Sequence, residues 1–110
     1  MNHIFEEIAA ERKRQNEKWG EQNHPMHFDD LVYAGCRKKL DDLRHMNDWR
    51  EKENTLSWFD ILEEEVYEAF AETDPVRQKA EMVQVAAVAV QIIEYLDRRI
   101  SKEDVRCSNI

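Results

Sequence analysis

Three glutamates in a short stretch have the spacing of a metal site. Glu64, Glu65 and Glu68 follow the pattern EExxE. On a helix, residues three and four apart are neighbours, so these side chains project from adjacent positions and their like charges repel. A divalent cation between them would remove that repulsion, and clustered carboxylates are ligands that Mg²⁺ and Mn²⁺ prefer. We therefore predict a carboxylate metal site on this helix.

A fourth carboxylate, Glu81, is placed to complete the cluster. The pair Asp74-Pro75 predicts a short turn, with Asp as the cap and Pro as the first residue of the next helix. A short turn makes the two helices antiparallel neighbours, so Glu81 is expected to face Glu65 and Glu68. Glu81 also precedes a largely apolar run, where a lone carboxylate is costly unless it is paired or bound to a metal.

Other interpretations of these residues stay open. Glu-rich helical stretches are usually solvated faces, and nearby cations could pair with the carboxylates in place of a metal. The candidates are Arg77, Lys79 and Arg98. Two histidines three apart in a loop, His24 and His27, form a weak metal pattern, and we favour a role for them other than metal binding.

The elements that must position these side chains are helical. Gly and Pro each occur twice, too rarely for the turns of a β-sandwich or barrel, while helix formers dominate. Asp29 and Ser57 are candidate N-caps, and Gly20 is a candidate end of the first helix. We predict one all-α domain over residues 1–110, an antiparallel four-helix bundle. Its helices are expected at 1–20, 29–53, 57–73 and 75–101, with a break or mobile stretch within 37–48 and a frayed tail at 102–110.

The last predicted helix is apolar over most of its circumference from residue 82 to residue 96. Such a helix must be covered on several sides, by the other helices or by a second subunit. A chain of 110 residues buries a limited fraction of its surface by itself. We therefore expect a homodimer or a higher homo-oligomer.

Charge and hydropathy restrict the partners. The formal net charge of −8 disfavours nonspecific binding of nucleic acid, which needs a basic surface. The apolar stretch in the last helix is too short and interrupted to span a bilayer, and the N-terminus does not read as a signal peptide. We expect a cytoplasmic protein with neither a nucleic-acid nor a membrane partner.

The carboxylate motifs resemble those of the MazG-like, all-α nucleoside triphosphate pyrophosphohydrolase superfamily, whose mark is EExxE on one helix and ExxD on the next. The matching stretches are residues 64–68 (EEVYE) and 81–84 (EMVQ). The sequences around them and the opening residues 11–25 are similar to a subgroup of small bacterial and phage proteins. The resemblance covers most of the chain, except the charged middle of the second segment and the tail, and it implies a MazG-like fold.

The resemblance also implies a reaction: Mg²⁺-dependent hydrolysis of a nucleoside triphosphate to a monophosphate and pyrophosphate. A bound metal neutralises phosphate charge and lowers the pKa of a bound water. Carried over by position, Glu65, Glu68 and Glu81 would be metal ligands, and Glu64 would be a ligand or orient the water. The catalytic set is then Glu64, Glu65 and Glu68. The aspartate of ExxD falls on Gln84, a neutral ligand that should lower the affinity for metal.

Contacts with a nucleotide are expected near the end of the first helix. Trp19 offers a flat ring on which a base stacks, or alternatively it packs against the bundle. Related all-α pyrophosphatases use aromatics of the N-terminal helix for stacking. Gln15 and Gln22 could read a base edge, and Lys18 or Lys38 could meet a phosphate.

A second literal ExxD, from Glu94 to Asp97, lies about 20 Å further along the last helix at about 1.5 Å per residue. We expect a surface or interface role for it. Three functions thus remain: a nucleotide pyrophosphohydrolase, a catalytically weak helical module that binds a nucleotide or a protein, and a scaffold dimer with a Glu-rich face. The substitution of Gln84 for the motif's aspartate favours the second.

Overall fold

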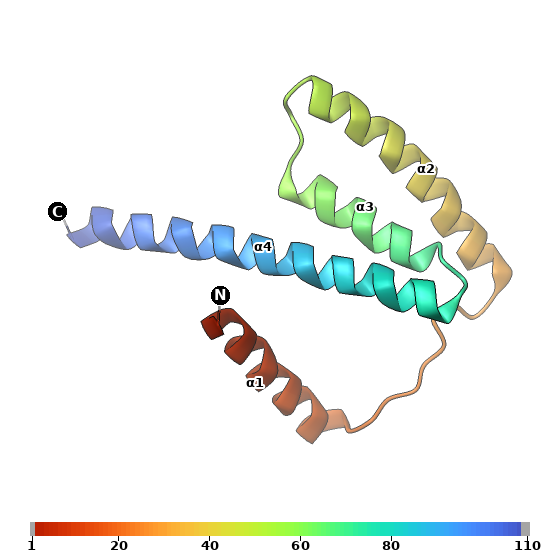
Figure 1. Ribbon diagram of the computed structural model, residues 1–110, viewed down its shortest axis with the longest axis horizontal. Coiled ribbons are helices and arrows are strands. Elements are labelled where there is room, and N and C mark those ends of the chain that lie inside the picture. The colour runs from red at the N-terminus through yellow and green to blue at the C-terminus, as the bar shows by residue number, and fades with distance from the viewer. Residues whose placement is uncertain (1, 109–110) are drawn as a thin grey trace. The chain divides into compact units, whose positions relative to one another are not determined.

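The computed structural model describes residues 2–108, with side chains from residue 3 to residue 102, and in this range it contains helices and no strand. The four helices are α1 (Asn2–Trp19), α2 (Asp30–Lys52), α3 (Trp58–Phe70) and α4 (Pro75–Ser108) (Figure 1). The all-α prediction is therefore confirmed. The antiparallel four-helix bundle stays a prediction.

The chain divides into two compact units. As far as the structure describes them, the first contains residues 2–24 and 90–108, which are α1 and the second part of α4. The second contains residues 25–89, which include α2, α3 and the first part of α4. The expected single domain stays a prediction, and each unit is described by itself below.

The helix ends follow from local signals in the sequence. Asp29 caps α2, where its Oδ1 accepts a hydrogen bond of 3.0 Å from the Val32 amide. Ser57 caps α3 in a reciprocal capping box with Asp60. Gly20 ends α1 with a φ of +67°, a left-handed conformation that costs glycine nothing. These three predicted helix boundaries are confirmed.

Two expected irregularities are absent from the described residues. Helix α2 runs without a break through residues 37–48, where charged residues of opposite sign stand four apart and support a helix, as Arg37 and Asp41 do. Helix α4 extends to Ser108 instead of ending near residue 101. No Gly or Pro follows Pro75, so nothing local stops the helix. Residues 109–110 of the predicted tail lie outside the described residues.

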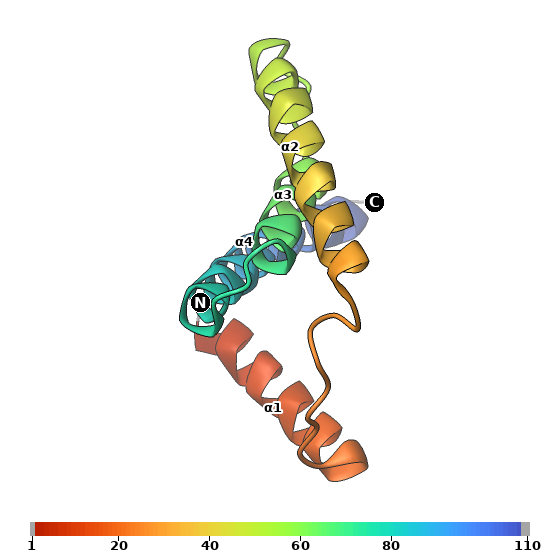
Figure 2. The same ribbon diagram turned by 90° about the vertical axis from the view of Figure 1, so that its right-hand side faces the viewer.

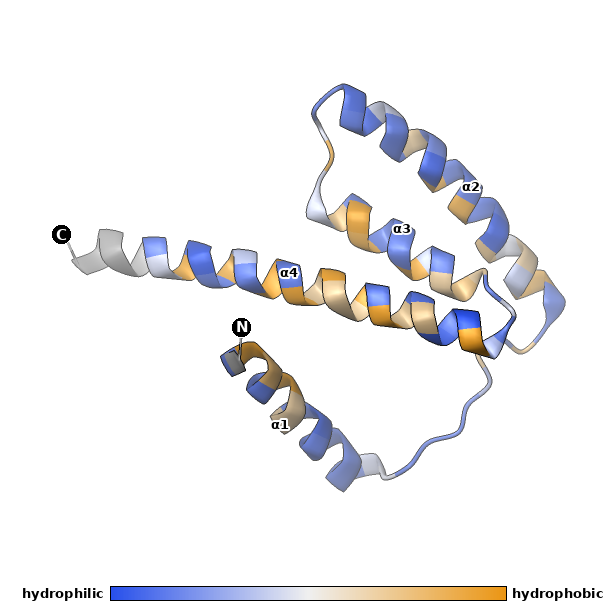
Figure 3. Ribbon diagram, in the orientation of Figure 1, coloured by the Kyte–Doolittle hydropathy of each residue, from blue (hydrophilic) through white to orange (hydrophobic). Residues whose placement is uncertain are grey.

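The second unit is held together by a small core. Helices α2 and α3 lie side by side and antiparallel (Figures 1 and 2). Leu40 and Leu43 of α2, Ala69 of α3 and Val88 of α4 are buried. Figure 3 shows that α2 is mostly hydrophilic, whereas apolar residues are spread around the middle of α4. The few buried residues of α2 thus fix which of its faces meets α3.

The first unit joins the start of α1 to α4. Ile4 is only 1% exposed, and His3 Nε2 lies 3.1 Å from Asp97 Oδ2. Asp97, the aspartate of the second literal ExxD, therefore pairs with a histidine of α1 and is 44% exposed, in line with the surface role expected for it. Among the described residues, no helix has the length and apolar character needed to cross a membrane.

Candidate metal centre

Three carboxylates of the second unit converge on one point. Glu65 and Glu68 extend from α3 and Glu81 from α4, and one oxygen of each lies within 4.8 Å of those of the other two. All three residues are partly buried. The convergence predicted from the helical spacing and the short turn is therefore present.

The turn between α3 and α4 sets this geometry. Asp74 caps α4, accepting a hydrogen bond of 3.0 Å from the Arg77 amide. One turn into α4, Gln78 Nε2 donates to the carbonyl oxygens of Ala69 (3.1 Å) and Glu72 (3.0 Å), which ties the start of α4 to the end of α3. Glu81 stands three residues after Gln78 and shares its side of the helix. The tie therefore directs Glu81 toward the glutamates of α3.

The cluster is electrostatically unsatisfied. The Oε2 atoms of Glu65 and Glu81 are buried and have no hydrogen-bond partner. Burial raises the pKa of Glu65, and the charges of Glu81 and Glu64 raise it further. Burial also raises the pKa of Glu68, with Glu65 adding to the increase and Arg44 opposing it. Carboxylates in this state gain from a bound proton or a bound cation.

The described arginine that contacts the cluster belongs to α2, whereas the competing cations expected from the sequence belong to α4. Arg44 of α2 places its Nη2 3.5 Å from Glu68 Oε1, while Arg77 pairs with Asp74 instead (3.7 Å, Nε to Oδ2). The sequence signal for Arg44 is its place four residues after Leu40, on the side of α2 where Leu40 and Leu43 are buried. Arg44 contacts one carboxylate and leaves the two buried orphan oxygens of the cluster without partners.

Glu64 is engaged by α2. Asn47 Nδ2 donates to Glu64 Oε1 and to the carbonyl oxygen of Asp60, both at 3.1 Å, and Asn47 is itself buried. Arg50 Nη1 donates to Asn47 Oδ1 at 2.7 Å. This network was also missed; its signal is a polar residue four positions after the buried Leu43. The role of Glu64 as a ligand or as a group that orients water stays a prediction.

The donor set fits a hard divalent cation. Three carboxylates from two helices, two of them with buried orphan oxygens, offer the oxygen ligands that Mg²⁺ and Mn²⁺ use. Gln84, one turn beyond Glu81 on α4, is exposed. Its role as a fourth ligand stays a prediction.

All the expected nucleotide contacts except Lys38 lie in the first unit. Gln15, Trp19 and Gln22 line one surface cavity of about 620 Å³. Trp19 is 56% exposed, and Lys18 Nζ lies 4.7 Å from the centroid of its ring. The ring therefore presents open surface in its own unit, as stacking would require, while Lys38 is exposed on α2. Their roles as nucleotide contacts stay predictions.

Both histidines of the loop before α2 have a hydrogen-bond partner. A ring nitrogen of His27 lies 2.7 Å from the carbonyl oxygen of Phe70, and the ring packs near those of Phe70 and Tyr33. His24 pairs with Gln22, 3.1 Å from Nε2 to Oε1. The first contact fastens the loop to the end of α3.

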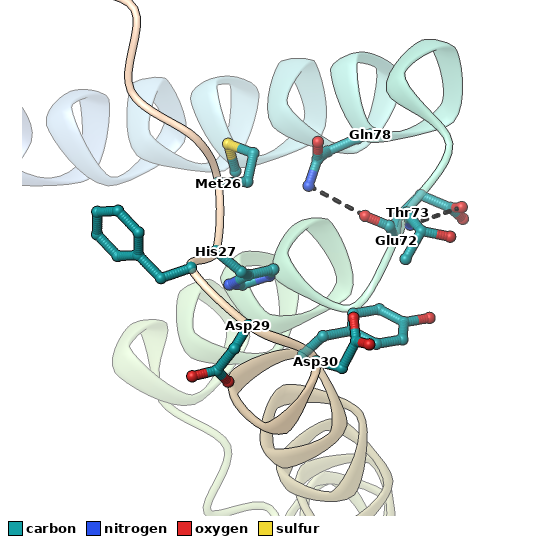
Figure 4. Close-up of a pocket in the computed structure, with 9 residues that line it drawn as sticks. Met26, His27, Asp29, Asp30, Glu72, Thr73 and Gln78 are labelled. Carbon is teal, nitrogen blue, oxygen red and sulfur yellow. Dashed lines mark hydrogen bonds between the residues drawn. The ribbon is translucent and has the colours of Figure 1, made fainter.

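His27 also lines a pocket of about 360 Å³ (Figure 4). Its described lining includes the carboxylates of Asp29, Asp30 and Glu72 and contains no lysine or arginine. Gln78 reaches across it to Glu72. This pocket is acidic and thus unsuited to an anion.

The chain was also compared with known proteins. No family model, no curated protein and no solved structure matched it. The resemblance to the MazG-like superfamily therefore rests on the sequence motifs quoted above.

Proposed function

We propose that this chain is an Mg²⁺-dependent nucleotide pyrophosphohydrolase that cleaves a nucleoside triphosphate into a monophosphate and pyrophosphate, with Mn²⁺ as an alternative metal. The observation that supports this most directly is the convergence of Glu65, Glu68 and Glu81 with two buried orphan oxygens. The resemblance of the EExxE and ExxQ stretches to MazG-like motifs supplies the reaction class. A MazG-like bundle, assembled as a cytoplasmic homodimer or higher oligomer, belongs to the same proposal.

In this proposal the side chains have separate tasks. Glu65, Glu68 and Glu81 hold the cation, which when bound neutralises phosphate charge and lowers the pKa of a bound water. Because the pKa values of Glu65 and Glu68 are raised, protons compete with the cation for these carboxylates. Glu64, fixed by Asn47, is the group proposed to orient the water.

The residues proposed to contact a base all belong to the first unit. The exposed Trp19 ring is proposed to stack on the base, and Gln15 and Gln22 to contact its edge. Lys18 adds a positive charge above the ring. An exposed aromatic face stacks on any base, so selectivity among bases would come from the side-chain amides of Gln15 and Gln22.

The decisive experiment is a panel of nucleoside triphosphates with detection of released pyrophosphate, in Mg²⁺ and in Mn²⁺. Wild type should release pyrophosphate from at least one nucleotide, and Glu68→Gln should lower kcat/KM by roughly a hundredfold or more. Glu63→Gln is the matched control, since it removes the same charge from α3 outside the cluster, and it should stay within about twofold. Equal activity of the two variants would contradict the assignment.

A catalytically weak binding module is the second candidate. The observation that favours it is Gln84, a neutral and exposed residue at the position of the motif's acid. The variant Gln84→Asp separates the two candidates. If wild type is silent on every nucleotide and only Gln84→Asp releases pyrophosphate, the chain is a module whose catalytic set is incomplete.

A further inference from the structure

Beside the carboxylate cluster, the second unit contains a cleft lined by two arginines. Its volume is about 300 Å³, and its lining comes from α2, α4 and the end of α3. Arg37 and Arg44 line it from α2, and Glu68 and Glu81 line it from α3 and α4. Because these two glutamates also belong to the cluster, the arginines and two of the proposed metal ligands share one space.

Arg44 has unused hydrogen-bonding capacity. Its distance of 3.5 Å to Glu68 Oε1 exceeds the 2.7–2.9 Å typical of charge-assisted hydrogen bonds, and its side chain is 52% exposed. A guanidinium has five N–H donors in a fork that matches carboxylates and phosphates. The single long contact with Glu68 leaves most of these donors available.

Arg37 stands seven residues before Arg44, two turns away on the same face of α2. Its guanidinium carbon lies 6.0 Å from the centroid of the Tyr33 ring. Among the described residues, the structure shows no ion pair for Arg37. The two arginines thus place two positive charges along one wall of the cleft.

The charge balance of the cleft depends on the cluster. Its described lining contains two arginines and four carboxylates, those of Asp41, Glu68, Glu72 and Glu81, which gives a formal charge of −2. Glu65 completes the cluster and brings the formal charge to −3. A divalent cation there would reduce this charge to −1, so an anion could then approach the two arginines. The neighbouring pocket that His27 lines has three carboxylates and, in its described lining, neither lysine nor arginine. The arginine-lined cleft is therefore the better fit for phosphate.

We propose that the cleft between Arg37 and Arg44 binds the phosphate chain of a triphosphate, and that Arg44 exchanges Glu68 for a phosphate oxygen when a cation occupies the cluster. The proposal rests on the proposed function, because the cation site is the same. Cation and phosphate chain then bind with positive coupling, each strengthening the affinity for the other.

Calorimetric titration of the full chain with inorganic tripolyphosphate, with and without excess Mg²⁺, tests this. Wild type should bind tripolyphosphate about tenfold more tightly when Mg²⁺ is present. Arg37→Gln and Arg44→Gln should each weaken that binding by about tenfold, the loss expected for a charged hydrogen bond. Lys39→Gln is the control: it removes the same charge from the exposed side of α2, does not line the cleft, and should bind as wild type does.

Two further measurements keep the result interpretable. Far-UV circular dichroism and thermal melting establish that each variant is folded. Arg44→Lys, which keeps the positive charge, should bind tripolyphosphate more tightly than Arg44→Gln and less tightly than wild type. A nucleoside triphosphate analogue with an uncleavable α–β bridge should show the same dependence on both arginines, since the phosphate chain is the shared group.

The failures of the two proposals are distinguishable. If Mg²⁺ binding and hydrolysis are intact while both arginine variants bind tripolyphosphate like Lys39→Gln, the cleft assignment is overturned and the proposed function stands. If the cluster binds neither Mg²⁺ nor Mn²⁺, the proposed function fails. In that case, tripolyphosphate binding that still depends on Arg37 and Arg44 would support an anion site in the cleft without a metal site. If tripolyphosphate does not bind either, both the cleft assignment and the proposed function are overturned.

Discussion

Replacing Glu68 by Gln should stabilise the cation-free protein at neutral pH while removing most of its response to Mg²⁺. The three carboxylates of the cluster have oxygens within 4.8 Å of one another. At this separation two unit charges repel by about 3.5 kcal/mol at an effective dielectric constant of about 20, and by about 0.9 kcal/mol in water. The Glu68 side chain is 20% exposed, so its repulsion by Glu65 and Glu81 lies between these limits.

The substitution also has a cost. It removes the pairing with Arg44, and an ion pair with one half-exposed partner contributes about 1 kcal/mol or less. Gln keeps the shape of the side chain, so no cavity forms. We expect a net gain of about 1–2 kcal/mol in the free energy of unfolding, and a rise in Tm of roughly 3–8 °C.

The gain should depend on pH with a definite sign. Burial and neighbouring charges raise the pKa of Glu68 above its ordinary value of 4.5, so the folded state binds its proton more tightly than the unfolded state does. Between the ordinary and the raised pKa the unfolded chain therefore holds fewer protons, and stability falls as pH rises. The advantage of Glu68→Gln should be absent below the ordinary pKa and complete above the raised one.

Thermal melts from about pH 4 to about pH 8, in a chelator and in Mg²⁺, measure both effects. At a cation concentration ten times Kd, wild type should gain about 1.4 kcal/mol, and Glu68→Gln much less. Glu63→Gln should show neither the stabilisation without cation nor the loss of the Mg²⁺ response. The reasoning is refuted if Glu68→Gln is less stable than wild type in the chelator at neutral pH, or if it gains as much from Mg²⁺.

Three further predictions concern the supports of the site. Ser57→Ala should cost about 1 kcal/mol by removing the N-cap of α3, read as a lower midpoint in urea; a midpoint unchanged from wild type would contradict the capping role. Asn47→Ala should lower the free energy of unfolding by about 1–3 kcal/mol, because it leaves the Asp60 carbonyl and Glu64 without their buried donor. If Glu64 orients water, the same variant should lower kcat more than it raises KM. Ile4→Ala should lower the stability of the first unit by about 2–5 kcal/mol, measured by tryptophan fluorescence and circular dichroism during unfolding. A loss below about 1 kcal/mol would mean that Ile4 is not buried in solution.

The parts of the site that the sequence predicted are those fixed by short-range geometry. The N-caps, at Asp29 and Ser57, depend on a hydrogen bond to an amide three residues away, so the residue types suffice to find them. The approach of Glu81 to Glu65 and Glu68 follows from helical periodicity and a turn too short to permit any other packing.

The contributions of α2 were not predictable in the same way. The rotation of α2 about its own axis depends on which residues meet α3. Only Leu40, Leu43 and Asn47 are buried, in a helix that is mostly hydrophilic. Because that signal is weak, the charged middle of α2 suggested a break. It proved to be the segment that presents Arg37 and Arg44 to the cleft.

A proton, an arginine and a divalent cation all relieve the same repulsion in the cluster, so they compete for it. Arg44 makes one long contact with Glu68 and so relieves only part of the repulsion, and the raised pKa values of Glu65 and Glu68 indicate that protonation relieves it as well. Raising the pH removes the proton and also gives Arg44 a charged Glu68 to pair with. Affinity for Mg²⁺ should therefore rise with pH through the raised pKa values and then level off, with Arg44 as the remaining competitor. In Arg44→Gln, calorimetry should find the affinity for Mg²⁺ alone increased and that for tripolyphosphate decreased. A loss of both would mean that Arg44 supports the fold of the site and does not compete for Glu68.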